Sequence, residues 1–384
     1  MKYYSNKYIE TILNKDNIDI KFLFHYLYII TYIRVFRFKD RRYNKEDFVP
    51  VNITTLRKVV NHDYAISFVR DLVNLGIIES NNTFSRKNHQ STGYRLTKEV
   101  LTEKFYIPEK TDEKLNTRIK KAYDKLKLKL IQEDNLGYGY VTECMEHVQI
   151  DEGKAIDFIK DLDSDKKEFY EMQIQQFSNK FFSKDKTGNR LHNNLTNLYT
   201  PLRNFLSYNG EKLSQCDLRN SQLVFLYLLM KDCYINSNEL ERFRYIVCEY
   251  GFYEFFAEKL NVSLTEETRK GFKVSVFENL LFGTNKLKLT DLEKVFKEEF
   301  PDIFYAMKFI KNEKYNTLAI ELQRKESTFI FDCVRKLNKS IPLLTIHDSI
   351  VTTKGNEKTV SDLIAKEFKE KYNIAVKIKT EIFA

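Results

Sequence analysis

The chain has little of several residue types that mark particular classes of protein. It has no tryptophan, and its 384 residues include only 11 glycines, 5 prolines and 5 cysteines. The scarcity of glycine and proline argues for a mainly helical body with short loops. The cysteines are scattered and form no C-x-x-C pair with histidines at zinc-finger spacing, which argues against a zinc module and a disulfide framework. We therefore expect a reducing, cytoplasmic setting.

Long hydrophobic runs are also missing. The N-terminus, M-K-Y-Y-S-N-K-Y, has no apolar segment of the kind that a signal peptide requires. The apolar run that begins at Phe22 is short, and His25 and Arg34 interrupt or close it. It predicts a buried helix, and we expect no membrane partner.

Charged and aromatic residues, in contrast, are plentiful. Lys plus Arg number 63 against 54 Asp plus Glu, which gives a net charge of +9. This modest excess favours a polyanionic partner such as a nucleic acid. The 24 tyrosines and 30 phenylalanines are of a type that stacks on bases, although filling a hydrophobic core is their commoner use. The length allows two or three domains.

The first hundred residues contain a series of helix and hairpin signals. V-N-I-T-T-L-R-K-V-V (51–60) predicts a short helix, and the following segment (61–79) predicts a turn and a second helix that ends at Gly76. A β-hairpin with a basic tip follows, from I-I-E-S to Y-R-L-T. This order resembles winged helix-turn-helix domains, a class of DNA-binding domain.

The resemblance implies a DNA-binding domain over residues 1–105. The helix around Tyr64 to Asn74 would face a groove of duplex DNA. Three residues on the wing would contact phosphates: Arg86, Lys87 and His89. A winged helix used for protein contacts or as a structural cap is the alternative, because a fold does not fix a function. Residues 106–183 follow as a helical linker or thumb-like region, whose lysine-rich helix would either track a nucleic-acid backbone or form a solvated face.

Two aspartates stand out in the C-terminal half. C-D-L-R-N-S-Q-L-V-F-L places Asp217 at the end of a predicted strand and before an apolar helix, and P-L-L-T-I-H-D-S-I-V-T-T places Asp348 at the tip of a predicted hairpin. Two carboxylates that meet at the edge of one sheet suit a pair of Mg²⁺ ions, with Mn²⁺ as the alternative, and hence two-metal phosphoryl transfer. Simpler roles stay open: Asp217 as a helix N-cap and Asp348 as an ordinary turn residue.

Five segments between residues 187 and 353 resemble, in order, the motifs of family A DNA polymerases. T-G-N-R-L-H-N-N-L-T-N-L (187–198) resembles T-x-x-G-R-L-S-S-x-x-P-N-L-Q-N-I-P, with an inserted asparagine and no proline. The Asp217 segment resembles motif A, and R-K-G-F-K-V-S-V-F-E-N-L-L-F-G (269–283) resembles motif B, with its final Phe-Gly one residue late. L-Q-R-K-E-S-T-F-I-F-D-C-V (322–334) resembles a later helix, and I-H-D-S-I-V (346–351) resembles motif C.

This second resemblance implies an α+β, mostly helical fold. A compact right-hand polymerase-like palm with a small antiparallel sheet, and with reduced fingers and thumb, would occupy residues 184–384. It implies a DNA polymerase that extends the 3′-OH of a DNA primer-template with dNTPs. The small size and the fused DNA-binding domain suit the replication of a mobile element, plasmid or phage. Asp217 and Asp348 would be the catalytic residues and metal ligands of this polymerase.

The remaining motif residues would bind the substrates. Arg269 and Lys273, one helical turn apart, would bind triphosphate oxygens unless they form an ordinary solvated face. Three further residues would meet the base and sugar of the nucleotide: Phe277, Phe282 and Gln222. Primer or template contacts would come from three others: Arg190, Gln323 and His347. A half-buried turn residue is an equally good interpretation of His347.

Gln222 and Phe282 bear on the choice of sugar. Family A DNA polymerases carry Glu where this chain has Gln222, and its bulk blocks a ribose 2′-OH. The related single-subunit RNA polymerases use a motif B Tyr hydroxyl where this chain has Phe282. Both residues therefore favour dNTPs. Two alternatives remain: a non-catalytic DNA-binding replication initiator or regulator with a decayed palm, and an RNA polymerase or primase, because those relatives share the H-D-S of motif C.

Overall fold

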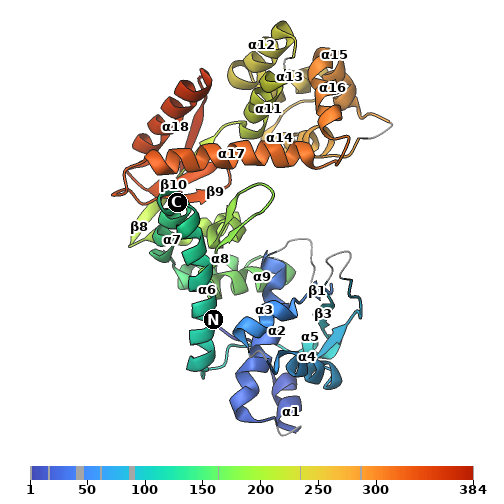
Figure 1. Cartoon of the computed structure of the whole chain (residues 1–384), viewed down its shortest axis with the longest axis vertical. Coiled ribbons are helices and arrows are strands. Elements are labelled where there is room, and N and C mark those ends of the chain that lie inside the picture. Colours follow the sequence, from blue (N-terminus) through green and yellow to red (C-terminus); the bar gives the residue numbers. More distant parts are fainter. Residues whose placement is uncertain are drawn as a thin grey trace. The chain divides into compact units, whose positions relative to one another are not determined.

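Helices predominate in the chain, and its strands form small antiparallel sheets (Figure 1). The computed structural model describes residues 2–15, 18–39, 47–60, 63–85, 91–162, 164–233, 235–285 and 288–383. The predicted α+β, mostly helical fold class is confirmed. Within the described ranges, no helix combines the length and the apolar character needed to cross a membrane.

The chain divides into two compact units. The first comprises residues 1–129, 149–182 and 197–205, and the second comprises residues 130–148, 183–196 and 206–384. The region expected as a linker or thumb (106–183) contributes to both units, because the chain passes from one to the other several times.

The N-terminal part of the first unit is built around helix α2, whose residues Ile29 and Ile30 are fully buried. Its elements are α1 (Lys7–Lys15), η1 (Ile20–Phe22), α2 (Leu23–Lys39), β1 (Val49–Pro50), α3 (Ile53–Val59), α4 (Ala65–Asn74), β2 (Ile78–Ser80), β3 (Gly93–Leu96) and α5 (Lys98–Thr102). The three strands form an antiparallel sheet in the order β1-β3-β2. Gly76, with φ +67°, follows the end of α4.

The assignment of this part to the winged-helix class stays a prediction. Two successive helices, α3 and α4, are followed by the paired strands β2 and β3, which is the helix, helix and hairpin order that the sequence predicts. The predicted wing contacts Arg86, Lys87 and His89 lie outside the described residues.

The first unit is completed by segments from further along the chain. They contain α6 (Glu113–Glu133), which continues into the second unit, α8 (Glu152–Ile159), α9 (Ser164–Gln175) and η3 (Thr200–Phe205). Tyr199 stacks on Tyr170 of α9 with ring centroids 4.0 Å apart. The side-chain amide of Gln173 donates to the Asn197 carbonyl at 2.7 Å. Residues 197–205 therefore close the unit against α9.

The second unit contains a central sheet whose middle strand is β8. Its elements are η2 (Asn135–Gly139), α7 (Tyr140–Glu146), β4 (Val148–Ile150), β5 (Ser183–Lys184), β6 (Leu191–His192), α10 (Asn194–Asn197), β7 (Leu206–Tyr208), β8 (Glu211–Leu218), α11 (Ser221–Asp232), α12 (Ser237–Tyr245), η4 (Ile246–Tyr250), α13 (Phe252–Lys259), α14 (Glu266–Ser275), η5 (Val276–Leu281), α15 (Asp291–Glu299), α16 (Pro301–Ile310), α17 (Thr317–Lys336), β9 (Leu344–Ile346), β10 (Ser349–Thr353), α18 (Glu357–Tyr372) and β11 (Ile378–Ile382). β10 and then β9 lie on one side of β8, while β7 and β11 pair with its other side.

Phenylalanines form the core of this unit, which is the commoner of the two uses that the sequence analysis left open. Phe225 of α11, Phe329 of α17 and Phe368 of α18 contact one another with ring centroids 4.9 to 6.2 Å apart, and all three are buried. A second group joins α12, α13 and α15, and consists of Phe243, Phe252, Phe256, Phe296 and Phe300.

Candidate active site

β8 and the β9–β10 hairpin bring Asp217 and Asp348 to one edge of the sheet. Asp217 is the last residue but one of β8, and it pairs with Ser349, the first residue of β10. Asp348 lies with His347 in the two-residue turn before Ser349. The antiparallel register thus places the two half-buried carboxylates beside each other. Asp217 is not a helix cap, because Asn220 occupies the N-cap position of α11.

The surroundings of Asp217 disfavour its ionised form. Burial and the neighbouring Asp348 carboxylate raise the pKa of Asp217 to about 7, although the ammonium groups of Lys273 and Lys379 act to lower it. Two carboxylates this close repel each other when both are ionised, and a bound cation removes that repulsion. The pair therefore has the charge and the ligand type that a divalent cation needs.

The donor set fits Mg²⁺. This ion prefers oxygen ligands, keeps several of its waters, and is often held by one or two carboxylates together with substrate phosphates. Over the described part of the chain, no three His, Cys, Asp or Glu side chains are grouped to hold a metal ion. Asp217 and Asp348 supply the two carboxylates of this kind of site.

A third carboxylate, Glu326 of α17, lies next to this pair. Its side chain is 1% exposed. One oxygen accepts a hydrogen bond from Arg190 Nη2, and the other accepts from Gln222 Nε2 and, at 3.0 Å, from the Ser221 hydroxyl. Burial raises the pKa of Glu326, while the Arg190 guanidinium opposes this. The Ser221 hydroxyl also lies 2.7 Å from Asp348 Oδ2, so Glu326 is connected to the pair of aspartates through one side chain.

The Ser221 hydroxyl joins two carboxyl groups with a single proton. A hydroxyl donates one hydrogen bond, so it cannot donate to an ionised Glu326 and an ionised Asp348 at the same time. It therefore donates to one of the two at a time and links their positions.

No motif in the sequence marks Glu326 or Ser221 as a site residue. A signal for Glu326 exists, because it follows Leu322 by four residues and precedes Phe329 by three, and both of these are buried. An acidic residue on the apolar face of a helix is rarely buried without a partner, so this position in the pattern indicates a polar contact inside the fold.

Arg190 and the two residues before it are held against α17, the helix that carries Gln323. Gly188 packs so closely on Gln323 that a Cβ atom there would lie 2.8 Å from Gln323 Oε1. The inserted Asn189 adopts φ +58°, in the left-handed region that asparagine tolerates, and its carbonyl accepts from the Ser327 hydroxyl at 2.8 Å. The Arg190 side chain is 18% exposed. The contacts of Arg190 and Gln323 with primer or template stay predictions.

His347 lies in the turn with φ +52° and is half-buried. Its ring packs edge-on against that of His192, with centroids 5.7 Å apart. The structure thus provides a packing partner for His347, and a contact with the primer end stays a prediction.

The predicted nucleotide-binding residues Lys273, Phe277 and Phe282 follow one another on α14 and the π-helical turn η5. Lys273 is exposed and lies near enough to Asp217 to lower its pKa. The Phe282 N–H donates to the Phe277 carbonyl at 2.8 Å, and their rings lie 5.3 Å apart. A π turn contains one more residue than an α turn. This extra residue accounts for the one-residue displacement of Phe282 from the expected spacing.

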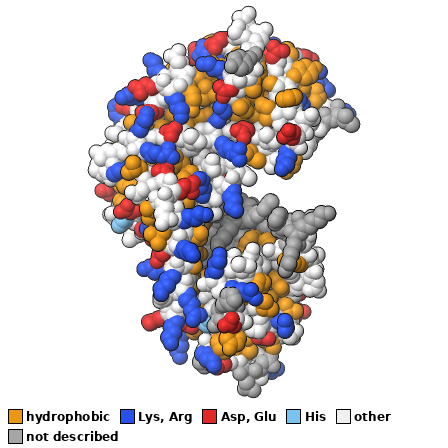
Figure 2. Space-filling view, in the orientation of Figure 1, with side chains coloured by type: hydrophobic (Ala, Val, Ile, Leu, Met, Phe, Trp, Pro, Cys, Tyr) orange, Lys and Arg blue, Asp and Glu red, His pale blue; other side chains and the backbone are white. Residues whose placement is uncertain are grey.

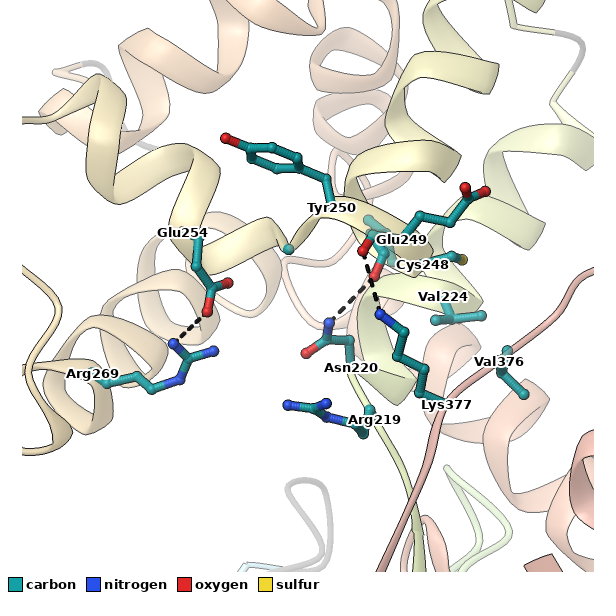
Figure 3. Close-up of a pocket in the computed structure, with 12 residues that line it drawn as sticks. Arg219, Asn220, Val224, Cys248, Glu249, Tyr250, Glu254, Arg269, Val376 and Lys377 are labelled. Atoms are coloured by element: carbon teal, nitrogen blue, oxygen red, sulfur yellow. Dashed lines mark hydrogen bonds and ion pairs between the residues drawn. The ribbon is translucent and has the colours of Figure 1, made fainter.

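Arg269, the fourth of these residues, lines an open cavity of about 110 Å³ in the second unit (Figure 3). The other lining residues are Arg219, Asn220, Val224, Val247, Cys248, Glu249, Tyr250, Gly251, Glu254, Val376 and Lys377. The Arg269 guanidinium forms an ion pair with Glu254 at 2.5 Å, and Figure 3 shows Arg219 and Lys377 across the cavity from this pair.

The cavity is suited to an anion with several oxygens. Three cationic side chains line it, from the end of β8 (Arg219), from α14 (Arg269) and from the start of β11 (Lys377). Of its two carboxylates, Glu249 forms an ion pair with Arg244. Guanidinium groups bind phosphate oxygens with paired, charge-assisted hydrogen bonds. The sequence carries no motif that marks Arg219 or Lys377, because only the fold brings them to Arg269.

Comparisons with known proteins give distant structural likenesses only. No protein-family model matches the chain, and no curated protein matches it. Among solved structures, the chain is similar to the POL domain of Pol1 from M. smegmatis in complex with DNA primer-template and dNTP. The two share 12% sequence identity and a TM-score of 0.42, over 56% of this chain and 51% of that chain. The match thus spans about half of each chain, and the assignment of a function rests on the site itself.

Proposed function

We propose that this chain is a template-directed DNA polymerase that transfers nucleotides from dNTPs to the 3′-OH of a primer. The observation that supports this most strongly is the proximity of the carboxylates of Asp217, at the end of β8, and Asp348, in the β9–β10 turn. Lys273 on α14 lies near Asp217. An acidic pair faced by a cationic helix suits metal ions and a triphosphate at once.

The proposed roles follow from the chemistry of each side chain. Two Mg²⁺ ions, when bound, would activate the 3′-OH and neutralise the leaving pyrophosphate. Asp217 and Asp348 would hold them in their ionised forms. Lys273 and Arg269 would bind triphosphate oxygens, and Arg219 would extend this cationic surface into the cavity of Figure 3.

The base and the sugar would be recognised by three side chains nearby. Phe277, half-buried on η5, would stack on the incoming base. Gln222 is buried next to Ser221, whose hydroxyl contacts Asp348, so its bulk lies close to the proposed reaction centre. Phe282 has no hydroxyl with which to favour a ribose 2′-OH. These features support a preference for dNTPs over rNTPs.

The first unit would recruit the enzyme to duplex DNA. Helix α4 exposes Ile66, Arg70 and Asn74 at intervals of four residues, so these side chains share one solvent-facing side of the helix. This side is the one that a winged helix would place in a DNA groove. The proposal for the first unit is independent of the proposal for the acidic pair.

Extension of a labelled primer-template with Mg²⁺ and each class of nucleotide tests the proposed function. We expect extension with dNTPs and little with rNTPs. Unprimed synthesis from rNTPs would instead identify an RNA polymerase or primase. Binding of DNA without incorporation of either class, with Mg²⁺ or Mn²⁺, would contradict the proposal and favour a replication initiator.

A further inference from the structure

We propose that Glu326 is a positioning residue that sets the sugar selectivity of the polymerase by fixing the side chain of Gln222. The inference rests on the proposed function, because it takes Gln222 to lie against the sugar of the incoming nucleotide. Glu326 itself is too deeply buried to be a substrate contact, since its side chain is 1% exposed.

The carboxylate of Glu326 gathers donors from two other segments of the second unit. Gln222 and Ser221 come from the first turn of α11, and Arg190 comes from the loop before β6. A buried carboxylate costs several kcal/mol unless donors surround it, and here three donors do so. The Glu326 carboxylate therefore has one well-defined position, and it restricts the positions of the side chains that bind it.

Glu326 also decides which end of the Gln222 amide it meets. An ionised carboxylate only accepts hydrogen bonds, so the Nε2 end of Gln222 points to Glu326 and the Oε1 end points away. Within the described part of the chain, this buried Oε1 atom has no hydrogen-bond partner. A buried acceptor without a partner is unfavourable, so Gln222 would not keep this orientation by itself. The bond to Glu326 holds it there.

Loss of Glu326 would release this constraint. Gln222 has three side-chain torsions, and a side chain that loses its only directional contact populates several rotamers. A mobile Gln222 would no longer present a fixed obstacle to a 2′-OH. The reaction rate would fall as well, because Glu326 also contacts Ser221 and, through it, Asp348. The ratio of kcat/KM for a dNTP over the matched rNTP separates the two effects.

The test measures this ratio for single-nucleotide incorporation by the full chain. We expect Glu326→Ala to lower the ratio at least about tenfold, as the loss of a hydrogen bond to a charged group would. Glu326→Gln keeps the shape but only one acceptor oxygen, so its ratio should lie between those of the wild type and Glu326→Ala. In a Gln222→Ala background, Glu326→Ala should change the ratio no further, because the two residues act as one unit.

Glu293 of α15 is the matched control. It is likewise 1% exposed, and it is held by an ion pair with Lys308 at 3.1 Å and by the Thr290 backbone N–H at 2.9 Å. Glu293→Ala removes a buried, paired carboxylate of the same unit without touching Gln222. It should lower the melting temperature and the rates with both sugars, and it should leave their ratio unchanged.

Three outcomes would overturn the inference. An unchanged ratio in Glu326→Ala is the first, and independent effects of Glu326→Ala and Gln222→Ala on the ratio are the second. If Glu326→Ala does not fold, an unchanged ratio in Glu326→Gln is the third. In each of these cases the wild type still incorporates nucleotides, so the proposed function stands. A wild type that incorporates neither sugar would overturn the proposed function together with this inference.

Discussion

Asp217 shows at the scale of one residue how a buried pair of acidic side chains lowers the stability of the fold that contains it. The pKa of Asp217 is raised to about 7, first by burial and then by Asp348. Holding it ionised above this pH is therefore unfavourable, and a bound cation would offset that cost. The sequence pattern predicts the positions of both aspartates, at a strand end and at a hairpin tip.

Each aspartate should be indispensable for nucleotide incorporation. We expect Asp217→Asn or Asp348→Asn to abolish incorporation and to change DNA affinity by no more than a few-fold, because phosphate contacts of basic residues dominate that affinity. Primer extension and a DNA-binding titration of the same preparations check this. Asp362→Asn is the control, since Asp362 is exposed on α18 and pairs with Lys358. Incorporation at near the wild-type rate by either site variant would contradict the metal assignment.

Stability should depend on pH through Asp217, with a defined sign. In the unfolded chain an aspartate has a pKa near about 4, against about 7 in the folded chain. Between these values the folded state binds more protons, so stability falls as pH rises through this window. We expect Asp217→Asn to be more stable than the wild type by about 1–3 kcal/mol at pH 8, and by much less at pH 5. Thermal melting in EDTA measures this, and equal melting temperatures at pH 8 would contradict it.

Glu326 marks the limit of prediction at this scale. Motif comparison directs attention to residues of expected type at expected spacing, and the helix around Glu326 matches only at Gln323. The partners of Glu326 lie more than a hundred residues away along the chain, at Arg190 and Ser221. No local pattern contains that information, because the contacts depend on how α11 and α17 pack.

At the scale of an element, the π turn η5 shows why spacing alone is an incomplete guide. Phe282 comes one residue later in the sequence than a continuous α-helix from α14 would need to bring it next to Phe277. The structure absorbs the extra residue in η5, so that the rings of Phe277 and Phe282 still meet. An α-helical pattern cannot reveal this, because a π turn needs no distinctive residue types.

The ion pair between α13 and α14 should oppose nucleotide binding. Arg269 is held by Glu254 at 2.5 Å while it lines the cavity. If the triphosphate binds Arg269, it must compete with Glu254. We therefore expect Arg269→Ala to raise the KM for dNTPs about tenfold, and Glu254→Gln to lower it, in steady-state kinetics with a fixed primer-template.

Lys294 provides the control for this pair of variants. It forms an exposed ion pair with Asp291 on α15 and does not line the cavity. Lys294→Ala should leave the KM unchanged, because an exposed ion pair contributes little. A rise in KM for Glu254→Gln would show that the ion pair positions Arg269 for the nucleotide, contrary to the expectation of competition.

At the scale of the whole molecule, the positive charges of a chain with a net charge of +9 are not spread evenly. Helix α6 carries five exposed lysines before the end of the first unit, Lys114, Lys120, Lys121, Lys125 and Lys129. Figure 2 shows Lys and Arg side chains gathered over this helix. A lysine-rich helix of this kind is suited to the phosphate backbone of a duplex.

The affinity for duplex DNA should therefore fall steeply with salt. Four phosphate contacts predict about a hundredfold loss of affinity between 50 and 200 mM salt, which fluorescence anisotropy with a labelled duplex measures. The double variant Lys120→Glu/Lys121→Glu should make the dependence on salt shallower. Lys358→Glu on α18 is the control and should not. A salt dependence that is identical in the wild type and the α6 variant would show that this helix is only a solvated face.

The interleaving of the two units along the chain has a consequence for how the protein is made. The first unit is complete only when Asn197–Phe205 has joined it, with Tyr199 stacked on Tyr170 and the Phe205 carbonyl bonded to the Asp151 N–H. A ribosome must therefore release more than half of the polypeptide before either unit has all its parts. The nascent N-terminal region would stay incompletely folded during this time. Residues 130–148 and 183–196 would emerge before the later strands of the second unit are synthesised. Molecular chaperones would bind the incompletely folded chain at this stage of synthesis.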